Sequence, residues 1–133
     1  MACYELNTTN STTVRNDSIY DLLKRIERMQ KEAVAAINQG PCDTCLLTPT
    51  FNTKPIAVYL CEGLFTAEGE AGAIINRFRV EEVRGDVVIL RLLLEAEGEL
   101  TCTNLTVTCR IGCICAIQCF DPITCTINCP LAV

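Results

Sequence analysis

The sequence predicts a mostly β fold, an antiparallel β-sandwich or jelly-roll-like domain with one N-terminal amphipathic α-helix. Three observations predict it. Hydrophobic residues recur at helical spacing only between residues 18 and 39. From residue 56 onward, short apolar segments are separated by short turns, as in antiparallel sheets. The strongest alternation of apolar and other residues runs from 105 to 129 and contains most of the cysteines.

The chain length of 133 residues is typical of a single domain. Residues 1–16 are rich in Asn, Thr and Ser without periodicity, which predicts a flexible arm that carries Cys3. An arm that docks on a neighbouring subunit is the alternative. We expect one domain over residues 17–133. It divides into a helix at 18–39, a cysteine-containing loop at 40–55 and a β-sandwich at 56–133.

The predicted helix has start and stop signals of its own. Ser18 and Asp21 resemble a capping box, and Gly40-Pro41 supplies a stop. Charged residues occupy the positions between the apolar ones. We expect the apolar stripe to pack on the core of its own domain, with a contact between subunits as the alternative. The stripe consists of Ile19, Leu22, Leu23, Ile26, Met29, Ala33 and Ile37.

The β region divides into strands at recognisable turns. Both faces of segment 87–94 are apolar, which is typical of a central strand covered on both sides. Segment 109–119 is long for one flat strand, so we expect a bend or bulge near Gly112, and a single bulge would reverse the alternation beyond it. The predicted strands are 56–61, 64–67, 74–83, 87–95 and 100–109, followed by the cysteine-rich segments.

Alternation also predicts which cysteines face the core. In a strand, Cys109, Cys113 and Cys119 share one face with Ile111, while Arg110 and the other even positions lie on the opposite face. We therefore expect these three cysteines to be internal. They either pair with cysteines on neighbouring strands or stay free as small buried hydrophobic residues.

Composition argues against several classes of function. There are 11 basic and 16 acidic residues, so no basic surface for nucleic acid is expected. The chain has no secretory signal at its start and no apolar run long enough to insert in a membrane. It has no histidine and no Gly-rich phosphate loop. We therefore expect no enzyme, no catalytic residues and no cofactor.

The cysteine content conflicts with a plain cytosolic protein. Eleven cysteines approach the density of disulfide scaffolds, which are usually secreted. Three explanations fit: bound metal, thiols kept reduced in a cytosol, or synthesis in a cytosol followed by oxidation outside it. Because eleven is odd, at least one thiol has no partner within the chain.

Cys42 and Cys45 form a C-x-x-C pair, which is half of a zinc or redox motif. The pair follows a helix instead of preceding one, which disfavours an activated redox thiol. Zinc needs four thiolates, for which Cys113 with Cys115, or Cys125 with Cys129, are candidates, but alternation along strands is not the usual ligand spacing. We expect no metal site. A zinc or copper(I) thiolate module is the alternative, followed by a thiol oxidoreductase.

Several segments resemble the CotZ/CotY/ExsY family of cysteine-rich spore coat and exosporium proteins. They occur in the family's order and span residues 18–120. The closest is C-I-C-A-I-Q-C-F at 113–120, and the others are T-K-P-I-A-V-Y at 53–59, F-R-V-E-E-V at 78–83, V-I-L-R-L-L at 88–93, and the helix followed by Cys42 and Cys45.

The resemblance implies a structural protein that assembles with itself, and with other coat and exosporium proteins, into ordered two-dimensional layers on the endospore surface. Synthesis in the mother-cell cytoplasm without a signal peptide, followed by oxidation, would explain the cysteine content. We expect a homo-oligomer in a hexameric lattice that disulfides harden. The candidates for bonds between subunits lie in the arm, loop and tail: Cys3, Cys42, Cys45, Cys125 and Cys129.

Overall fold

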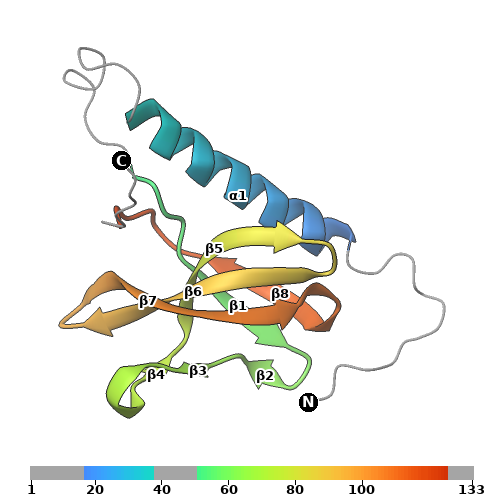
Figure 1. The fold of residues 1–133 in the computed structure, drawn as a ribbon. Helices are drawn as coiled ribbons and strands as arrows, with labels where there is room; N and C mark the ends of the chain where they lie inside the picture. The colour runs from blue at the N-terminus through green and yellow to red at the C-terminus, as the bar shows by residue number, and fades with distance from the viewer. Residues whose placement is uncertain (1–16, 38–50, 126–133) are drawn as a thin grey trace.

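The structure, a computed structural model, describes residues 17–37 and 51–125. One helix lies across one side of a curled antiparallel sheet, as Figure 1 shows. The helix is α1 (Asp17–Ile37), and the strands are β1 (Ile56–Leu60), β2 (Gly63–Leu64), β3 (Ala67–Glu68), β4 (Ile74–Ile75), β5 (Arg77–Arg84), β6 (Val87–Ala96), β7 (Glu99–Arg110) and β8 (Ile114–Cys119). Two short 3-10 helices, η3 (Glu70–Gly72) and η4 (Ile111–Cys113), interrupt the strands.

The main sheet has six strands in the order β2-β1-β5-β6-β7, and β8 pairs with β1. All its pairings are antiparallel. Register shifts at residues 80–82 of β5 and 91–93 of β6 mark bulges, which bend and twist a sheet. The predicted fold class is confirmed, and the sandwich takes the form of one curled sheet with a separate two-stranded sheet, β3–β4.

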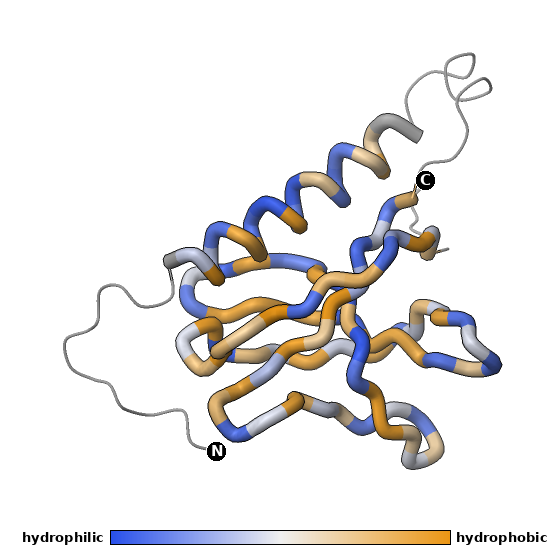
Figure 2. Tube along the Cα trace, turned by 180° about the vertical axis from the view of Figure 1, so that it is seen from behind, coloured by the Kyte–Doolittle hydropathy of each residue, from blue (hydrophilic) through white to orange (hydrophobic). Residues whose placement is uncertain are grey.

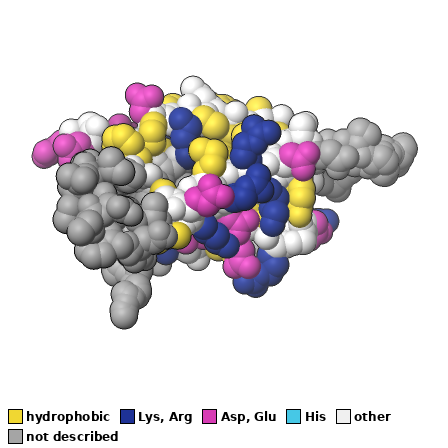
Figure 3. All heavy atoms as spheres, turned by 90° about the horizontal axis from the view of Figure 1, so that it is seen from above, with side chains coloured by type: hydrophobic (Ala, Val, Ile, Leu, Met, Phe, Trp, Pro, Cys, Tyr) yellow, Lys and Arg dark blue, Asp and Glu magenta, His cyan; other side chains and the backbone are white. Residues whose placement is uncertain are grey.

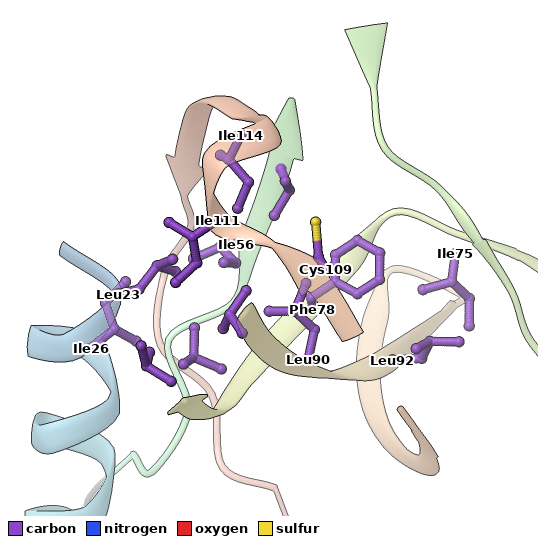
Figure 4. Close-up of a cluster of buried hydrophobic side chains, with 14 residues drawn as sticks. Leu23, Ile26, Ile56, Ile75, Phe78, Leu90, Leu92, Cys109, Ile111 and Ile114 are labelled. Atoms are coloured by element: carbon purple, nitrogen blue, oxygen red, sulfur yellow. The ribbon is translucent and has the colours of Figure 1, made fainter. Parts of the chain in front are cut away.

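The core lies inside the curl of the sheet and is closed by α1. Phe78 of β5 is fully buried at its centre, and its ring lies 5.4 Å from the ring of Phe65. Leu23 and Ile26 of α1 reach the same cluster (Figure 4). Hydrophobic residues therefore concentrate along the strands that face the helix, while most turns are hydrophilic (Figure 2).

The helix packs on its own sheet, as the stripe of apolar residues predicts. It contacts β5 and β8, and it begins one residue earlier than expected, at Asp17. Met29 departs from the prediction because 53% of its surface is exposed. Gln30 is buried instead, where its amide nitrogen donates to the carbonyl of Val80 at 2.7 Å and its oxygen accepts from the backbone NH of Lys54 at 2.9 Å. Among the described residues, no helix has the length and apolar character needed to span a membrane.

Two predicted strands are each split in two. The segment predicted at 64–67 contributes to β2 and β3, and the one predicted at 74–83 is divided between β4 and β5. The turns at 84–86 and around Gly98 are confirmed. At the second turn Glu97 and Gly98 both have positive φ, 55° and 83°, as a two-residue type I′ hairpin requires. The bend predicted near Gly112 is the helix η4, which turns the chain from β7 into β8.

Candidate functional site

Two disulfides that join pairs of described cysteines lie at different places on the sheet. The first joins Cys61, which follows β1, to Cys115 of β8, with Cα atoms 5.6 Å apart. Both residues are exposed. The bond ties the turn between β1 and β2 to the edge strand β8, in addition to the backbone pairing of β8 with β1. It connects positions 54 residues apart in the sequence.

The second crosslink joins Cys102 of β7 to Cys125, again with Cα atoms 5.6 Å apart. Cys125 is only 4% exposed. The sequence predicted that Cys125 would reach a neighbouring subunit, but here its partner lies in the same chain. The reason is that residues 120–125 do not project as a tail. The backbone NH of Thr53 donates to Ile123 O at 3.0 Å, and Ile123 NH donates back to Thr53 O at 2.9 Å.

A buried polar network supports this second crosslink. We use this name for Asn52, Thr53, Arg79, Glu81 and Arg91. The Asn52 side chain donates to the carbonyl of Cys125 at 3.0 Å and accepts from its backbone NH at 2.8 Å. The Thr53 hydroxyl donates to Asn52 Oδ1 at 2.7 Å and accepts from Arg79 Nε at 2.8 Å. The network therefore holds the segment that contains Cys125 in addition to the disulfide.

Glu81 is the charged centre of the polar network. Its Oε2 accepts from Arg79 Nη1 at 2.8 Å and from Arg91 Nε at 2.7 Å. Burial acts to raise the pKa of Glu81, but hydrogen bonds and charge from Arg91 and Arg79 outweigh it, so the pKa lies below its ordinary value. Arg91 also donates to the carbonyl of Thr103 at 2.8 Å, which links the network to β7. The arrangement is a structural tie between β5, β6 and β7.

The three cysteines predicted to be internal have three different environments. Cys109 is buried in the core cluster as a free thiol, and burial raises its pKa. Cys113 is half-buried and disulfide-bonded. Cys119 is a free thiol but exposed, which corrects the prediction. It lies opposite buried Ile56 in the register of β1 and β8, but it ends an edge strand, where the face that it shares is no longer covered.

The helix η4 explains the change of environment between these cysteines. Ile111, the first residue of η4, and Ile114, the residue that follows η4, are both buried, so the strict alternation of the sequence is broken. Cys115 consequently lies on the exposed side, where it meets Cys61. A further register shift between Tyr59 and Leu60 accommodates the extra residue.

Four predicted crosslinking cysteines, Cys3, Cys42, Cys45 and Cys129, lie outside the described residues. Sequence reasoning missed the roles of Cys61, Cys102 and Arg79. Arg79 left a weak signal, because an arginine inside an apolar strand needs a buried acceptor. Within residues 17–37 and 51–125, no three residues of the types that ligate metals come together.

Comparison with protein-family models, with curated proteins and with solved structures finds no match to this chain. The candidate site is therefore defined by its geometry. It consists of two crosslinks that hold the sheet and one exposed free thiol, Cys119, at its edge.

Proposed function

We propose that this protein is a non-enzymatic structural subunit of the outer layers of a bacterial endospore. It assembles with itself into ordered two-dimensional arrays in the coat or exosporium, and disulfides between subunits harden them. The sequence segments that resemble spore coat and exosporium proteins support the location. The exposed free thiol of Cys119 on an edge strand is the observation that carries the crosslinking role.

The position of Cys119 suits a bond to another copy. Strand β8 pairs with β1 alone among the described strands, so its other edge offers backbone groups for further pairing. A thiol on such an edge comes close to a second chain whenever that chain approaches the edge. Cys109, ten positions earlier in the same motif, is buried in the core cluster, with only 8% of its surface exposed.

The internal crosslinks have a complementary role. An array repeats only if each subunit keeps one shape while thiols around it are being oxidised. Cys61–Cys115 and Cys102–Cys125 remove four thiols from that chemistry, and the polar network holds the second pair in place. Cys119, the exposed free thiol, is then available to join subunits. We expect non-covalent contacts to form the array before disulfides lock it.

The test is negative-stain electron microscopy of the purified protein, with gels run with and without reductant. We expect sheets or closed shells and a ladder of covalent oligomers that reductant abolishes. Cys119→Ser should weaken the ladder, whereas the matched variant Cys109→Ser should leave it unchanged. Discrete monomers that are indifferent to reductant would contradict the proposal. Stoichiometric zinc, lost to a chelator together with the fold, would favour the metal-thiolate alternative.

A further inference from the structure

The outward side of α1 carries more cations than exposed carboxylates, although the chain as a whole has a net charge of −5. Four cations lie within residues 24–31, where Glu27 is buried, and the exposed carboxylates of the helix are Asp21 and Glu32. Glu27 is paired with Lys31 at 2.9 Å and more loosely with Lys24 at 3.8 Å. Arg25 and Arg28 are exposed, and neither forms an ion pair within residues 17–37 and 51–125.

The same side of the helix is hollowed and partly apolar. The apolar residue of the hollow is Ala35, and Met29, with 53% of its surface exposed, is a second exposed apolar residue of the helix that does not line the hollow. Figure 3 shows Lys and Arg side chains on this side of the molecule, with Asp and Glu and hydrophobic side chains among them. A surface of this kind fits a partner that offers both carboxylates and an apolar side chain. The hollow is lined by Lys24, Glu27, Arg28, Lys31, Glu32 and Ala35.

The turn between β6 and β7 has the opposite character. Glu95, Glu97 and Glu99 are all exposed there, and none has an ion-pair partner in the described part of the chain. Leu94, 37% exposed, adds an apolar side chain at the base of the turn. Because Glu97 and Gly98 adopt the φ angles of a tight type I′ turn, the tip is narrow, and the register of β6 and β7 places Glu95 and Glu99 on opposite faces of it.

These two surfaces cannot meet within one molecule. In Figures 1 and 2, which view it from opposite sides, the tip of the β6–β7 hairpin lies away from α1. We propose that the β6–β7 hairpin of one copy docks on the basic outward face of α1 of the next copy. The proposed occupant of the hollow is thus a second copy of this chain, because its hairpin supplies the carboxylates and the apolar side chain that this helix face can bind.

A contact of this kind joins two different surfaces head to tail. Such heterologous contacts close into rings or continue as open arrays, depending on the rotation between copies. The inference rests on the proposed function, because it specifies one of the non-covalent contacts that build the array. Attraction between opposite charges sets the orientation of the two copies and speeds their encounter. Salt weakens this attraction.

The experiment compares assembly of four variants in reductant, by sedimentation velocity and electron microscopy. The hairpin variant is E95K/E97K/E99K, and the helix variant is R25E/R28E. The third variant combines them, which restores opposite charges with the signs exchanged. The fourth, E68K/E70K/D121K, is a matched control that reverses three other exposed carboxylates. Circular dichroism and thermal melts establish that each variant is folded.

We expect each single-surface variant to raise the concentration needed for assembly about tenfold or more, because like charges then face each other. The combined variant should recover most of the loss, and the control should match wild type. Raising salt from about 0.15 to 0.5 M should weaken wild-type assembly.

Wild-type arrays that the hairpin and helix variants form equally well would overturn this contact and leave the proposed function standing. Loss of assembly in both variants without recovery in the combined one would also overturn it. A wild-type protein that forms no arrays would overturn the contact and the proposed function together. Binding of wild type to anionic phosphatidylserine vesicles, abolished by R25E/R28E and untouched by the hairpin variant, would assign the helix face to lipid and overturn the contact.

Discussion

The two free thiols among the described residues, Cys109 and Cys119, lie on strands joined directly by η4 but in opposite environments. Cys109 is the last residue but one of β7. It lies in the core cluster with Phe78 and Leu90, between the curled sheet and α1. Cys119 ends β8, an edge strand, and is open to solvent. The comparison shows that the position of a cysteine in the sheet, more than its spacing in the motif, decides whether its thiol is buried or exposed.

The largest effect on stability is expected from a substitution in the core cluster that encloses Cys109. Phe78→Ala should lower the free energy of unfolding by about 3–5 kcal/mol, because it opens a cavity at the centre of the core. Phe51→Ala is the control, since Phe51 is 57% exposed and should change stability by less than about 0.5 kcal/mol. Urea unfolding in reductant measures both. Equal losses of stability in the two variants would contradict the burial of Phe78 in the core.

The polar network offers a sharper version of the same comparison. Arg79 and Arg84 each pair with a glutamate two positions away on β5, but only the first pair is buried. Arg79→Met should cost about 3 kcal/mol, because it removes the donor to Thr53 and Asn52 as well as the ion pair. Arg84→Met should cost less than about 1 kcal/mol. Chemical denaturation of the two variants side by side would contradict this expectation if the losses were similar.

The two disulfides should differ in their contribution to stability. Each is expected to contribute about 2–4 kcal/mol. Cys61–Cys115 spans 54 residues and Cys102–Cys125 spans 23. Loop-closure entropy alone therefore makes the first bond more stabilising by about 0.7 kcal/mol. The polar network enlarges the difference by holding Cys125 when the second bond is absent. Thermal melts of C61A/C115A and C102A/C125A test the ranking, and the reverse order would contradict it.

The lowered pKa of Glu81 predicts that the free energy of unfolding depends on pH. Its pKa in the folded protein lies below the ordinary value of 4.5, so its stabilising contribution is complete above that pH and is lost as the pH falls through the lowered pKa. Glu81→Gln should therefore flatten the acid limb of a plot of unfolding free energy against pH. Glu82→Gln is the control, because Glu82 is solvent-exposed and its pairing with Arg84 is screened. Equal flattening by the two variants would contradict a special role for Glu81.

Sequence reasoning predicted the features that depend on local chemistry. The stripe that contains Leu23 and Ile26 predicted the packed face of α1, and Gly98 and Gly112 marked the hairpin turn and the bend. It did not predict the places where distant segments meet. Thr53 and Ile123 pair across the fold, which turns a predicted tail into a buried segment and Cys125 into an internal partner.

Edge positions were the second source of error. Alternation correctly assigned Cys119 to the face of β8 that lies opposite Ile56 in β1, but alternation carries no information on how far the core extends. Gln30 and Arg79 were missed for a related reason. A polar side chain is buried only where a specific hydrogen-bond acceptor is available. The acceptor for Gln30 lies on β5 and those for Arg79 are residues 52–53, both far away in the sequence.

The most direct test is to map disulfides in arrays assembled from an equal mixture of ¹⁴N- and ¹⁵N-labelled chains. Pepsin fragments analysed by mass spectrometry separate bonds within a chain from bonds between chains. We expect Cys61–Cys115 and Cys102–Cys125 fragments of a single isotope, Cys109 as a free thiol, and Cys119 in fragments that mix the two isotopes. Recovery of Cys119 as a free thiol from oxidised arrays, or mixed isotopes at Cys102–Cys125, would contradict the proposed division of roles.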